Sequence, residues 1–421
     1  MRKGPFDELS KKKARDRALV KKHMGRLAME GAIRIVPGFS WFGKNIGIKD
    51  GTLDFGGILS DVPCQAAGVF TRNTMPGAPV LVGREHLRDG VLQGVIVNSK
   101  NANVATGERG VEDSRKICEL FAEQCGIDAS SVLPSSTGVI GRRLPMDVIV
   151  RGCSTLKEDF GKTERHIETF ARSIMTTDTR PKWVSAQVEG ATILGIAKGA
   201  GMIEPNMATM LCYFATDAAV PSFELQPMLE RVVDKSFNRV SVDTDTSTSD
   251  TVVILANGLA GKVDLGRFEE VLSAMAVHLA KEIARDGEGA TKLIELIVSG
   301  AASAEQALLT AKSIINSPLI KTAIYGADPN WGRFVMAVGK VFTYRVDIAS
   351  LKILFGKGIE RPMIDAETID RDEVPLDAIS EMLKRDEVHL EVILGNGPYS
   401  ETVWGCDLTE GYIRENAHYT T

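Results

Sequence analysis

The centre of the chain carries the stretch Lys198-Gly-Ala-Gly-Met-Ile-Glu-Pro-Asn-Met-Ala-Thr-Met-Leu211, which leads into an apolar run. Two glycines and one proline precede a small residue and a threonine. Glycine permits positive φ angles and close backbone approach, and proline restricts the residue before it. The stretch therefore predicts a tight loop that enters a strand. A loop of this kind can hold a peptide carbonyl in a strained conformation.

Thr209 gives this loop a second interpretation. A hydroxyl held next to a strained carbonyl can attack it, and hydrolysis of the resulting ester would free the α-amine of Thr209. An N-terminal threonine carries its own general base, because the new amine lies beside the hydroxyl. Glycine-rich loops are far more often simple turns. The local residues therefore leave two interpretations open, a turn and a self-cleavage between Ala208 and Thr209.

Strand-like runs alternate with helical patterns along the rest of the chain, which predicts the α/β (α+β) class. Runs rich in apolar and β-branched residues predict strands at 90–97, 252–256 and 390–395. Apolar residues repeat at intervals of three and four over 267–286 and 223–236, which predicts two amphipathic helices. Pro227 is expected in the first turn of the second helix, where its missing N–H is tolerated.

The composition is that of an ordinary globular protein, with 421 residues of which 44% are hydrophobic and 25% charged. This length allows two domains or one large composite fold. The net charge of -5 gives no basic surplus for a nucleic-acid partner. No run approaches the roughly 18 consecutive apolar residues of a membrane-spanning helix. Six scattered cysteines without a CxxC pair predict reduced thiols in a cytosolic protein.

The first 27 residues differ from the rest, because they carry ten lysines or arginines against three acids. No apolar segment follows them, so a secretory signal is not expected. Charge runs of this kind usually form a solvated helix or arm. We therefore expect residues 1–30 to be a basic N-terminal extension outside the folded core.

A second candidate site is the stretch Ser135-Ser-Thr-Gly-Val-Ile-Gly141. Small residues with a hydroxyl and a bare glycine can present backbone N–H groups to a developing oxyanion. The alternative is a strand-to-helix turn capped by a hydroxyl. The acidic stretch 243–250 could likewise ligate a hard cation or form a polar turn network, and it lacks the glycine and the distal glutamate of an EF-hand loop.

Several common catalytic patterns do not occur in the sequence. It contains no G-x-S-x-G elbow, no GK[ST] phosphate loop and no HExxH helix. The six histidines show no metal-ligand spacing. An enzyme without a histidine motif needs another base, and the amine of a freed Thr209 would serve.

Together these segments resemble the glutamate N-acetyltransferase family, also called ornithine acetyltransferase, of arginine biosynthesis. The resemblance covers residues 30–421 and rests on long, specific motifs. They are 198–211, Ser136-Thr-Gly-Val-Ile-Gly141, 243–251, 327–333, Trp404-Gly-Cys-Asp-Leu408 and Asn416-Ala-His-Tyr-Thr-Thr421.

The resemblance implies a layered αββα sandwich with a smaller C-terminal α/β domain. It implies self-cleavage into an α chain, 31–208, and a β chain, 209–421, which stay associated in a cytoplasmic α2β2 assembly. Thr209 would take the acetyl group of N2-acetylornithine, release ornithine and pass the acetyl group to glutamate in a ping-pong reaction. The resemblance implies no metal and no organic cofactor, and it leaves acetyl-CoA open as a second donor.

The family's site residues carry over by position. Thr137 and Gly138 would form the oxyanion hole for Thr209. The amino-acid pocket would also have a cation for the substrate carboxylate and an anion for its amine. Its remaining lining residues would be Thr176, Lys198, Glu288, Asn416 and Thr421, which implies a C-terminus folded into the site.

This sequence departs from the family pattern in a few places. Lys100 stands where a glycine is common, Asp243-Thr-Asp replaces Asp-Gly-Asp, and Glu204 adds a charge beside the cleavage loop. Two alternatives to the acetyltransferase remain. One is a self-processed aminopeptidase or amidohydrolase of related fold, whose acyl acceptor is water. The other is an uncleaved, inactive homologue that acts as a binding or scaffold protein.

Overall fold

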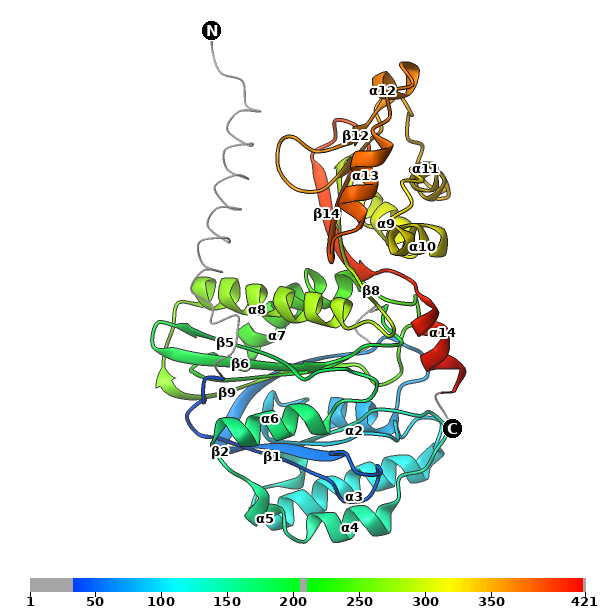
Figure 1. The fold of residues 1–421 in the computed structure, drawn as a ribbon. Helices are drawn as coiled ribbons and strands as arrows, with labels where there is room; N and C mark the ends of the chain where they lie inside the picture. The colour runs from blue at the N-terminus through cyan, green and yellow to red at the C-terminus, as the bar shows by residue number, and fades with distance from the viewer. Residues whose placement is uncertain (1–32, 205–209, 419–421) are drawn as a thin grey trace.

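A computed structural model describes residues 33–204 and 210–418 of the chain. The N-terminal extension 1–30 and the residues Ala208, Thr209 and Thr421 lie outside the described residues. The described chain forms two unequal domains, the larger built on an eight-stranded sheet and the smaller on a six-stranded sheet (Figure 1).

The eight-stranded sheet folds into two layers along strand β2 (Phe55–Phe70). The first half of β2 pairs with β1 and β3, and its second half, from Gln65 onward, pairs with β9. A register shift between Leu59 and Cys64 separates the two halves. The strand order is β4-β3-β2-β9-β7-β6-β5, with bounds β1 Phe39–Lys44, β3 Val91–Asn98, β4 Val132–Ser136, β5 Lys182–Val188, β6 Ala191–Lys198, β7 Leu211–Ala218 and β9 Thr251–Gly261.

Helices cover both outer faces of the folded sheet (Figure 1). Helices α7 and α8 pack on the layer of β5, β6, β7 and β9, and α3, α4 and α5 pack on the opposite layer. Helix α6 lies between the layers, where Phe170 contacts both Trp41 and Tyr213. This arrangement is the expected αββα sandwich, with helix bounds α2 Ala78–His86, α3 Gly107–Cys125, α4 Met146–Cys153, α5 Leu156–Asp159, α6 Glu164–Ser173, α7 Ser222–Asp234 and α8 Leu265–Arg285.

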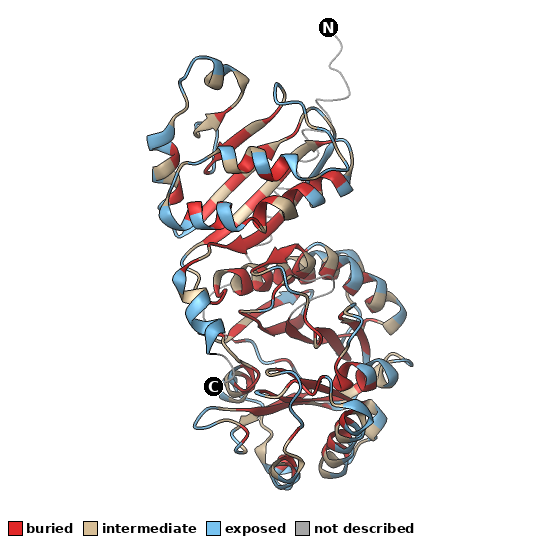
Figure 2. Ribbon diagram, turned by 90° about the vertical axis from the view of Figure 1, so that its right-hand side faces the viewer, coloured by how far each residue is buried: buried red, intermediate tan, exposed pale blue. Residues whose placement is uncertain are grey.

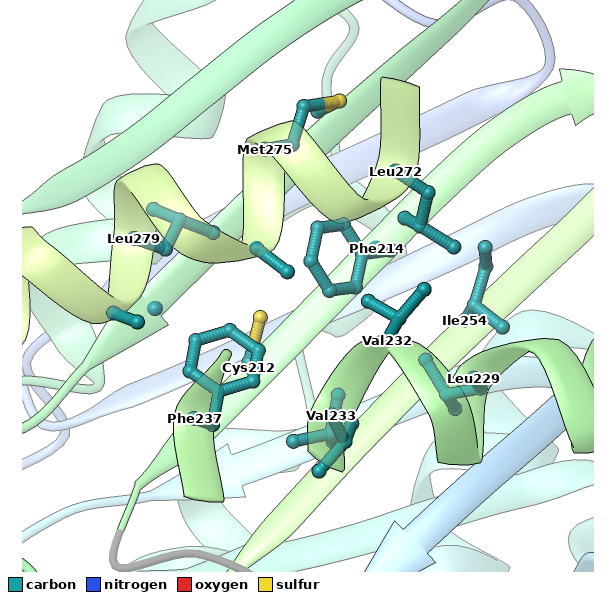
Figure 3. Packing of buried hydrophobic residues seen from close by; sticks show 14 of the residues in the cluster. Cys212, Phe214, Leu229, Val232, Val233, Phe237, Ile254, Leu272, Met275 and Leu279 are labelled. Carbon is teal, nitrogen blue, oxygen red and sulfur yellow. The ribbon is translucent and has the colours of Figure 1, made fainter. Parts of the chain in front are cut away.

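The two predicted amphipathic helices, α8 and α7, bury their apolar faces in the core of the larger domain. Leu272, Met275 and Leu279 of α8 belong to one buried cluster with Leu229 and Val232 of α7, and Phe214 of β7 lies between the two helices (Figure 3). Burial of these apolar side chains stabilises the domain by about 1.5–3 kcal/mol for each of them.

The prediction for Pro227 is wrong, because Pro227 lies inside α7 beyond the first turn. The helix continues through it because its apolar face is buried: Leu225, Met228 and Leu229 all pack into the core. Tertiary packing therefore outweighs the local cost of the missing N–H.

The smaller domain is built mainly from residues 293–406, and one short strand from earlier in the chain joins its sheet. Its sheet order is β12-β11-β13-β10-β14-β8, and the core lies between this sheet and its helices (Figure 2). β8 (Val240–Ser241) pairs with β14 and links this sheet to the larger domain. The other bounds are β10 Leu293–Ala301, β11 Lys352–Phe355, β12 Met363–Ile364, β13 Glu387–Ile393, β14 Tyr399–Cys406, α9 Ala304–Ile315, α10 Pro318–Gly326, α11 Gly332–Gly339, α12 Ala366–Asp370, α13 Leu376–Leu383 and α14 Glu410–Ala417, with short 3-10 turns Ala129–Ser131 and Phe237–Arg239 in the larger domain.

The predicted strands at 90–97, 252–256 and 390–395 correspond to β3, β9 and β13, and the predicted helices correspond to α8 and α7. Helix α14 follows the smaller domain and returns to the larger one (Figure 1). Within the described ranges, no helix combines the length and the apolar composition needed to cross a bilayer.

The fully buried Phe214 should be a major stabilising residue of the larger domain. We expect Phe214→Ala to lower the free energy of unfolding by about 3–5 kcal/mol, because the lost burial leaves a cavity. The same substitution at Phe223, which is 73% exposed on α7, should change it by less than about 0.5 kcal/mol. Urea denaturation of both variants measures the difference, and equal losses would contradict the packing described above.

Candidate functional site

One pocket of about 110 Å³ collects most of the predicted site residues. Its lining comes from the end of β4, the turn before β5, the end of β6, the residues after α8, and helix α14. Six predicted residues line it: Thr137, Gly138, Thr176, Lys198, Glu288 and Asn416. Thr209, Ala208 and Thr421 belong to the same prediction and lie outside the described residues.

Thr137 and Gly138 follow β4 and form the proposed oxyanion site. The Thr137 amide donates to the Asn98 carbonyl at 3.1 Å, so it is not available to a ligand. Gly138 has φ +126°, and a Cβ there would lie 2.2 Å from the Lys100 carbonyl oxygen. Among the described residues, neither the Thr137 hydroxyl nor the Gly138 amide has a hydrogen-bond partner. The donor pair is therefore one hydroxyl and one amide, where the sequence suggested backbone N–H groups.

Lys198 is the cation of the pocket and lies at the last position of β6. Its Nζ donates to Thr176 Oγ1 at 3.0 Å, and the residue is only 8% exposed. Burial lowers the pKa of Lys198 below its ordinary value, while the charges of Asp178 and Glu288 act in the opposite direction. Among the described residues, Thr176 is the one hydrogen-bond partner of this Nζ, so the ammonium group is suited to bind the carboxylate of a ligand.

Three buried charged side chains that the sequence did not single out lie next to Lys198, on the side away from the pocket. They are Asp178, Lys182 and Asp286. Lys182 Nζ donates to Asp178 at 2.7 Å and to Asp286 at 2.5 Å, and all three side chains are buried. Burial alone would raise the pKa of Asp178, but Lys182 and Lys198 hold it well below its usual range. Asp178 lies in the loop before β5 and Lys182 begins that strand, so no local pattern in the sequence indicated this group.

Glu288 is the carboxylate of the pocket and lies just after α8. Its Oε2 accepts a hydrogen bond from Asn416 Nδ2 at 2.7 Å, and its amide donates to the Ala200 carbonyl at 3.0 Å. Gly201 leaves room for it, because a Cβ at Gly201 would lie 2.2 Å from Glu288 Cδ. The close approach of carboxylate and backbone explains why a glycine stands at this point of the central stretch.

Helix α14 reaches the pocket through contacts with the chain next to Glu288. Thr409 Oγ1 donates to the Gly289 carbonyl at 2.6 Å, and a Cβ at Gly289, where φ is +67°, would meet the Tyr412 amide. These contacts place Asn416 beside Glu288, as the predicted C-terminal pocket residue requires.

The acidic stretch 243–250 holds both flanks of the central loop. Asp243 accepts from the amides of Met202 and Ile203 at 2.6 and 2.7 Å, and Asp250 Oδ1 accepts from the Met210 amide at 2.9 Å. This is a polar turn network, and no group of potential metal-ligating side chains occurs among the residues that the structure describes.

Glu204 is anchored upstream of the loop by residues of the smaller domain. Its carboxylate accepts from Ser241 at 2.9 Å and from Asn316 at 2.5 Å, with Lys312 Nζ 3.7 Å away. The charge that the sequence placed beside the loop is therefore an inter-domain contact, and it does not line the pocket.

Asp250 is a second residue that the sequence did not assign to the site. It is 1% exposed, and its Oδ2 has no hydrogen-bond partner among the described residues. Burial raises the pKa of Asp250 well above its ordinary value. The structure therefore favours a protonated, neutral carboxyl next to Met210.

The pocket combines groups suited to one kind of ligand. A cation and a carboxylate can bind the two charges of an amino acid, and the donor pair after β4 can stabilise an oxygen that becomes negative. No motif for a cofactor appears in the sequence around these residues.

Comparisons with known proteins give a consistent result. The family model described as the ArgJ family matches residues 40–421. The arginine biosynthesis bifunctional protein ArgJ 2 of Clostridium acetobutylicum is 48% identical over 387 residues, which are 92% of this chain and 98% of that protein. A glutamate N-acetyltransferase of Streptomyces clavuligerus is 48% identical over 373 residues, 88% of this chain and 94% of that protein.

Among solved structures, the ornithine acetyltransferase of Mycobacterium tuberculosis in complex with ornithine is 36% identical to this chain. It matches with a TM-score of 0.40 and covers 43% of this chain and 98% of that chain.

The raised pKa of Asp250 predicts a pH-dependent stability. The carboxyl of the unfolded chain loses its proton near pH 4, while the folded one keeps it to higher pH, so folding weakens as pH rises through this window. Asp250→Asn cannot titrate and should gain stability relative to wild type between about pH 4 and pH 7. Urea denaturation at both pH values measures the gain.

Asp61→Asn is the control, because Asp61 is an exposed carboxylate paired with Lys162 at 2.6 Å. It should show no such gain. If Asp250→Asn differs from wild type by the same amount at both pH values, the neutral state of Asp250 is wrong.

Proposed function

Because the chain belongs to the ArgJ family, we propose that it moves an acetyl group from N2-acetylornithine to glutamate. It is an acyltransferase, a glutamate N-acetyltransferase of arginine biosynthesis. The observation that carries the proposal is the pocket that gathers Lys198, Glu288 and the Thr137–Gly138 donors from distant segments.

We propose Thr209 as the nucleophile, released by cleavage of the Ala208–Thr209 bond. The Thr209 hydroxyl adds to the Ala208 carbonyl, the peptide nitrogen leaves as the α-amine, and water hydrolyses the ester to a carboxylate and the free hydroxyl. The products are an α chain, 31–208 preceded by the extension 1–30, and a β chain, 209–421. Support comes from the flanks of the loop, because Glu204 and Met210 are both held by hydrogen bonds.

The acetyl transfer uses the same hydroxyl a second time. The α-amine of Thr209 takes the hydroxyl proton as the oxygen attacks the acetyl carbonyl of N2-acetylornithine, and the Thr137 hydroxyl and Gly138 amide donate to the oxyanion. Ornithine leaves with the proton, and glutamate then attacks the acetyl ester through its own amine. Neither half-reaction needs a metal or an organic cofactor.

The substrate is held through its charges. Lys198 and Thr176 would bind the α-carboxylate, and Glu288 with Asn416 would bind the side-chain ammonium of ornithine, with Thr421 completing the pocket. The low exposure of Lys198 and Glu288, 8% and 9%, supports this assignment, because charge-assisted hydrogen bonds are strongest away from water.

Further properties follow as proposals from the same family. The α and β chains would remain associated as an α2β2 assembly. A cytoplasmic location is supported by six free cysteine thiols in the described residues. Acetyl-CoA would be a second acetyl donor, since several relatives carry the name bifunctional protein.

The nucleophile is tested by electrophoresis and mass spectrometry of the purified chain. Wild type should give two smaller bands, and Thr209→Ala should give one intact band of 45.6 kDa, because it lacks the attacking hydroxyl. Thr209→Ser is the matched control and should still cleave. Cleavage of Thr209→Ala after Ala208 would refute the assigned nucleophile, and an intact wild-type chain would favour the inactive homologue.

The acyl acceptor is tested by incubating the enzyme with N2-acetylornithine in the presence and absence of glutamate. We expect sustained ornithine release with glutamate, in step with formation of N-acetylglutamate, because the proposed ping-pong reaction needs glutamate to take the acetyl group from the enzyme. Sustained release without glutamate, and no N-acetylglutamate, would instead identify an amidohydrolase.

A further inference from the structure

Four ionised side chains form one buried group at the end of β6. Lys182 lies between Asp178 and Asp286, with exposed side-chain fractions of 0%, 0% and 3% respectively, and Lys198 lies on the pocket side. Two carboxylates against Lys182 alone leave one negative charge uncompensated. Lys198 lies next to Asp178 and offsets this charge, as a charge buried away from water requires.

Asp178 accepts hydrogen bonds from two of the chain segments that line the pocket. Its Oδ1 accepts from Lys182 Nζ and from the Gly199 amide at 2.6 Å, and its Oδ2 accepts from the Thr176 amide at 3.0 Å. The Thr176 hydroxyl in turn accepts from Lys198. One carboxylate therefore joins the turn that carries Thr176 to the strand end that carries Lys198.

Asp286 connects the same group to the other charged residue of the pocket. It follows the last turn of α8 and accepts from the Thr179 amide at 3.1 Å and from the Thr179 hydroxyl. Glu288 lies two residues further along, where its amide is bonded to the Ala200 carbonyl. Asp178, Lys182 and Asp286 therefore connect the chain segments that carry Lys198 and Glu288.

We propose that Asp178 is a positioning residue that fixes Thr176 and Lys198 in the pocket and keeps Lys198 an ammonium ion for the substrate carboxylate. This inference rests on the proposed function, because it assumes that Lys198 binds a substrate carboxylate. Lys182 and Asp286 hold Asp178 in place and do not touch the substrate.

The charges around Lys198 give the direction of the effect. Asp178 and Glu288 favour its ammonium form, whereas burial, Lys182 and the nearby Lys49 oppose it. Burial is the largest of these influences, so the pKa of Lys198 is already below its ordinary value. Removal of the Asp178 charge must lower it further, and substrate binding should then fail at a lower pH.

Lys49 needs separate treatment in any test, because it responds to the same carboxylate. Its Nζ donates to the Met175 carbonyl at 2.5 Å, and burial lowers its pKa to about 8, with Asp178 acting against this shift. The experiment is therefore done in a Lys49→Met background.

The test compares pH profiles of kcat/KM for N2-acetylornithine with saturating glutamate. Asp178→Asn should shift the alkaline limb to lower pH and reduce kcat/KM at neutral pH by roughly tenfold, mainly through KM, as expected for a weakened charge-assisted contact. Glu282→Gln is the matched control on α8, since it breaks an exposed ion pair with Arg180 of 2.9 Å and should leave the limb in place.

Asp286→Asn keeps the test decisive if Asp178→Asn does not fold or cleave. It removes one charge from the same buried group without touching Thr176 or Gly199, so the limb should shift in the same direction by a smaller amount. A uniform loss at every pH, with no shift of the limb in the soluble variants, would overturn the inference. Absence of acetyl transfer by the parent enzyme would instead overturn the proposed function.

Discussion

The register of three adjacent strands determines where the groups of the pocket lie. Lys198 of β6 is paired with Leu211 of β7, and Leu211 is paired with Thr251 of β9. Side chains alternate between the faces of a sheet, so a slip of one residue would turn each of them to the other face. The register therefore brings Lys198, Met210 and Asp250 to one edge, although they come from separate segments.

Buried charge at this edge is accommodated in two different ways. Asp178 is ionised because Lys182 and Lys198 lie beside it and two amides donate to it. Asp250 has an amide donor but forms no ion pair with a described residue, and burial favours its protonated form. The cost of removing a carboxylate from water explains both states, since it must be offset by a partner or avoided by keeping the proton.

Most candidate residues named from the sequence belong to long local motifs, whereas Thr176 and Glu288 were carried over by position from the family that the sequence resembles. Thr137 and Gly138 stand together after a strand, and Lys198 opens the glycine-rich stretch, so a motif could identify them. Asp178, Lys182 and Asp286 have no such context. Each is one acid or base among many, and their significance arises from burial and mutual contact. The prediction for Pro227 was wrong for a related reason. Packing of α7 against the core outweighed the local preference of proline for the first turn of a helix.

By itself, the sequence determined the α/β class and the main strands and helices, because apolar periodicity and residue type are local properties of the chain. The candidate site residues came from its resemblance to a known family. Tertiary structure alone decided that the Thr137 amide is already bonded and its hydroxyl remains for a ligand. It also decided that Gly201 must lack a side chain for the Glu288 carboxylate to fit, and that Asp178 accepts a hydrogen bond from the Gly199 amide next to Lys198. The physical reason is the same in each case: hydrogen-bond partners, steric room and the field at a buried charge depend on residues distant in sequence.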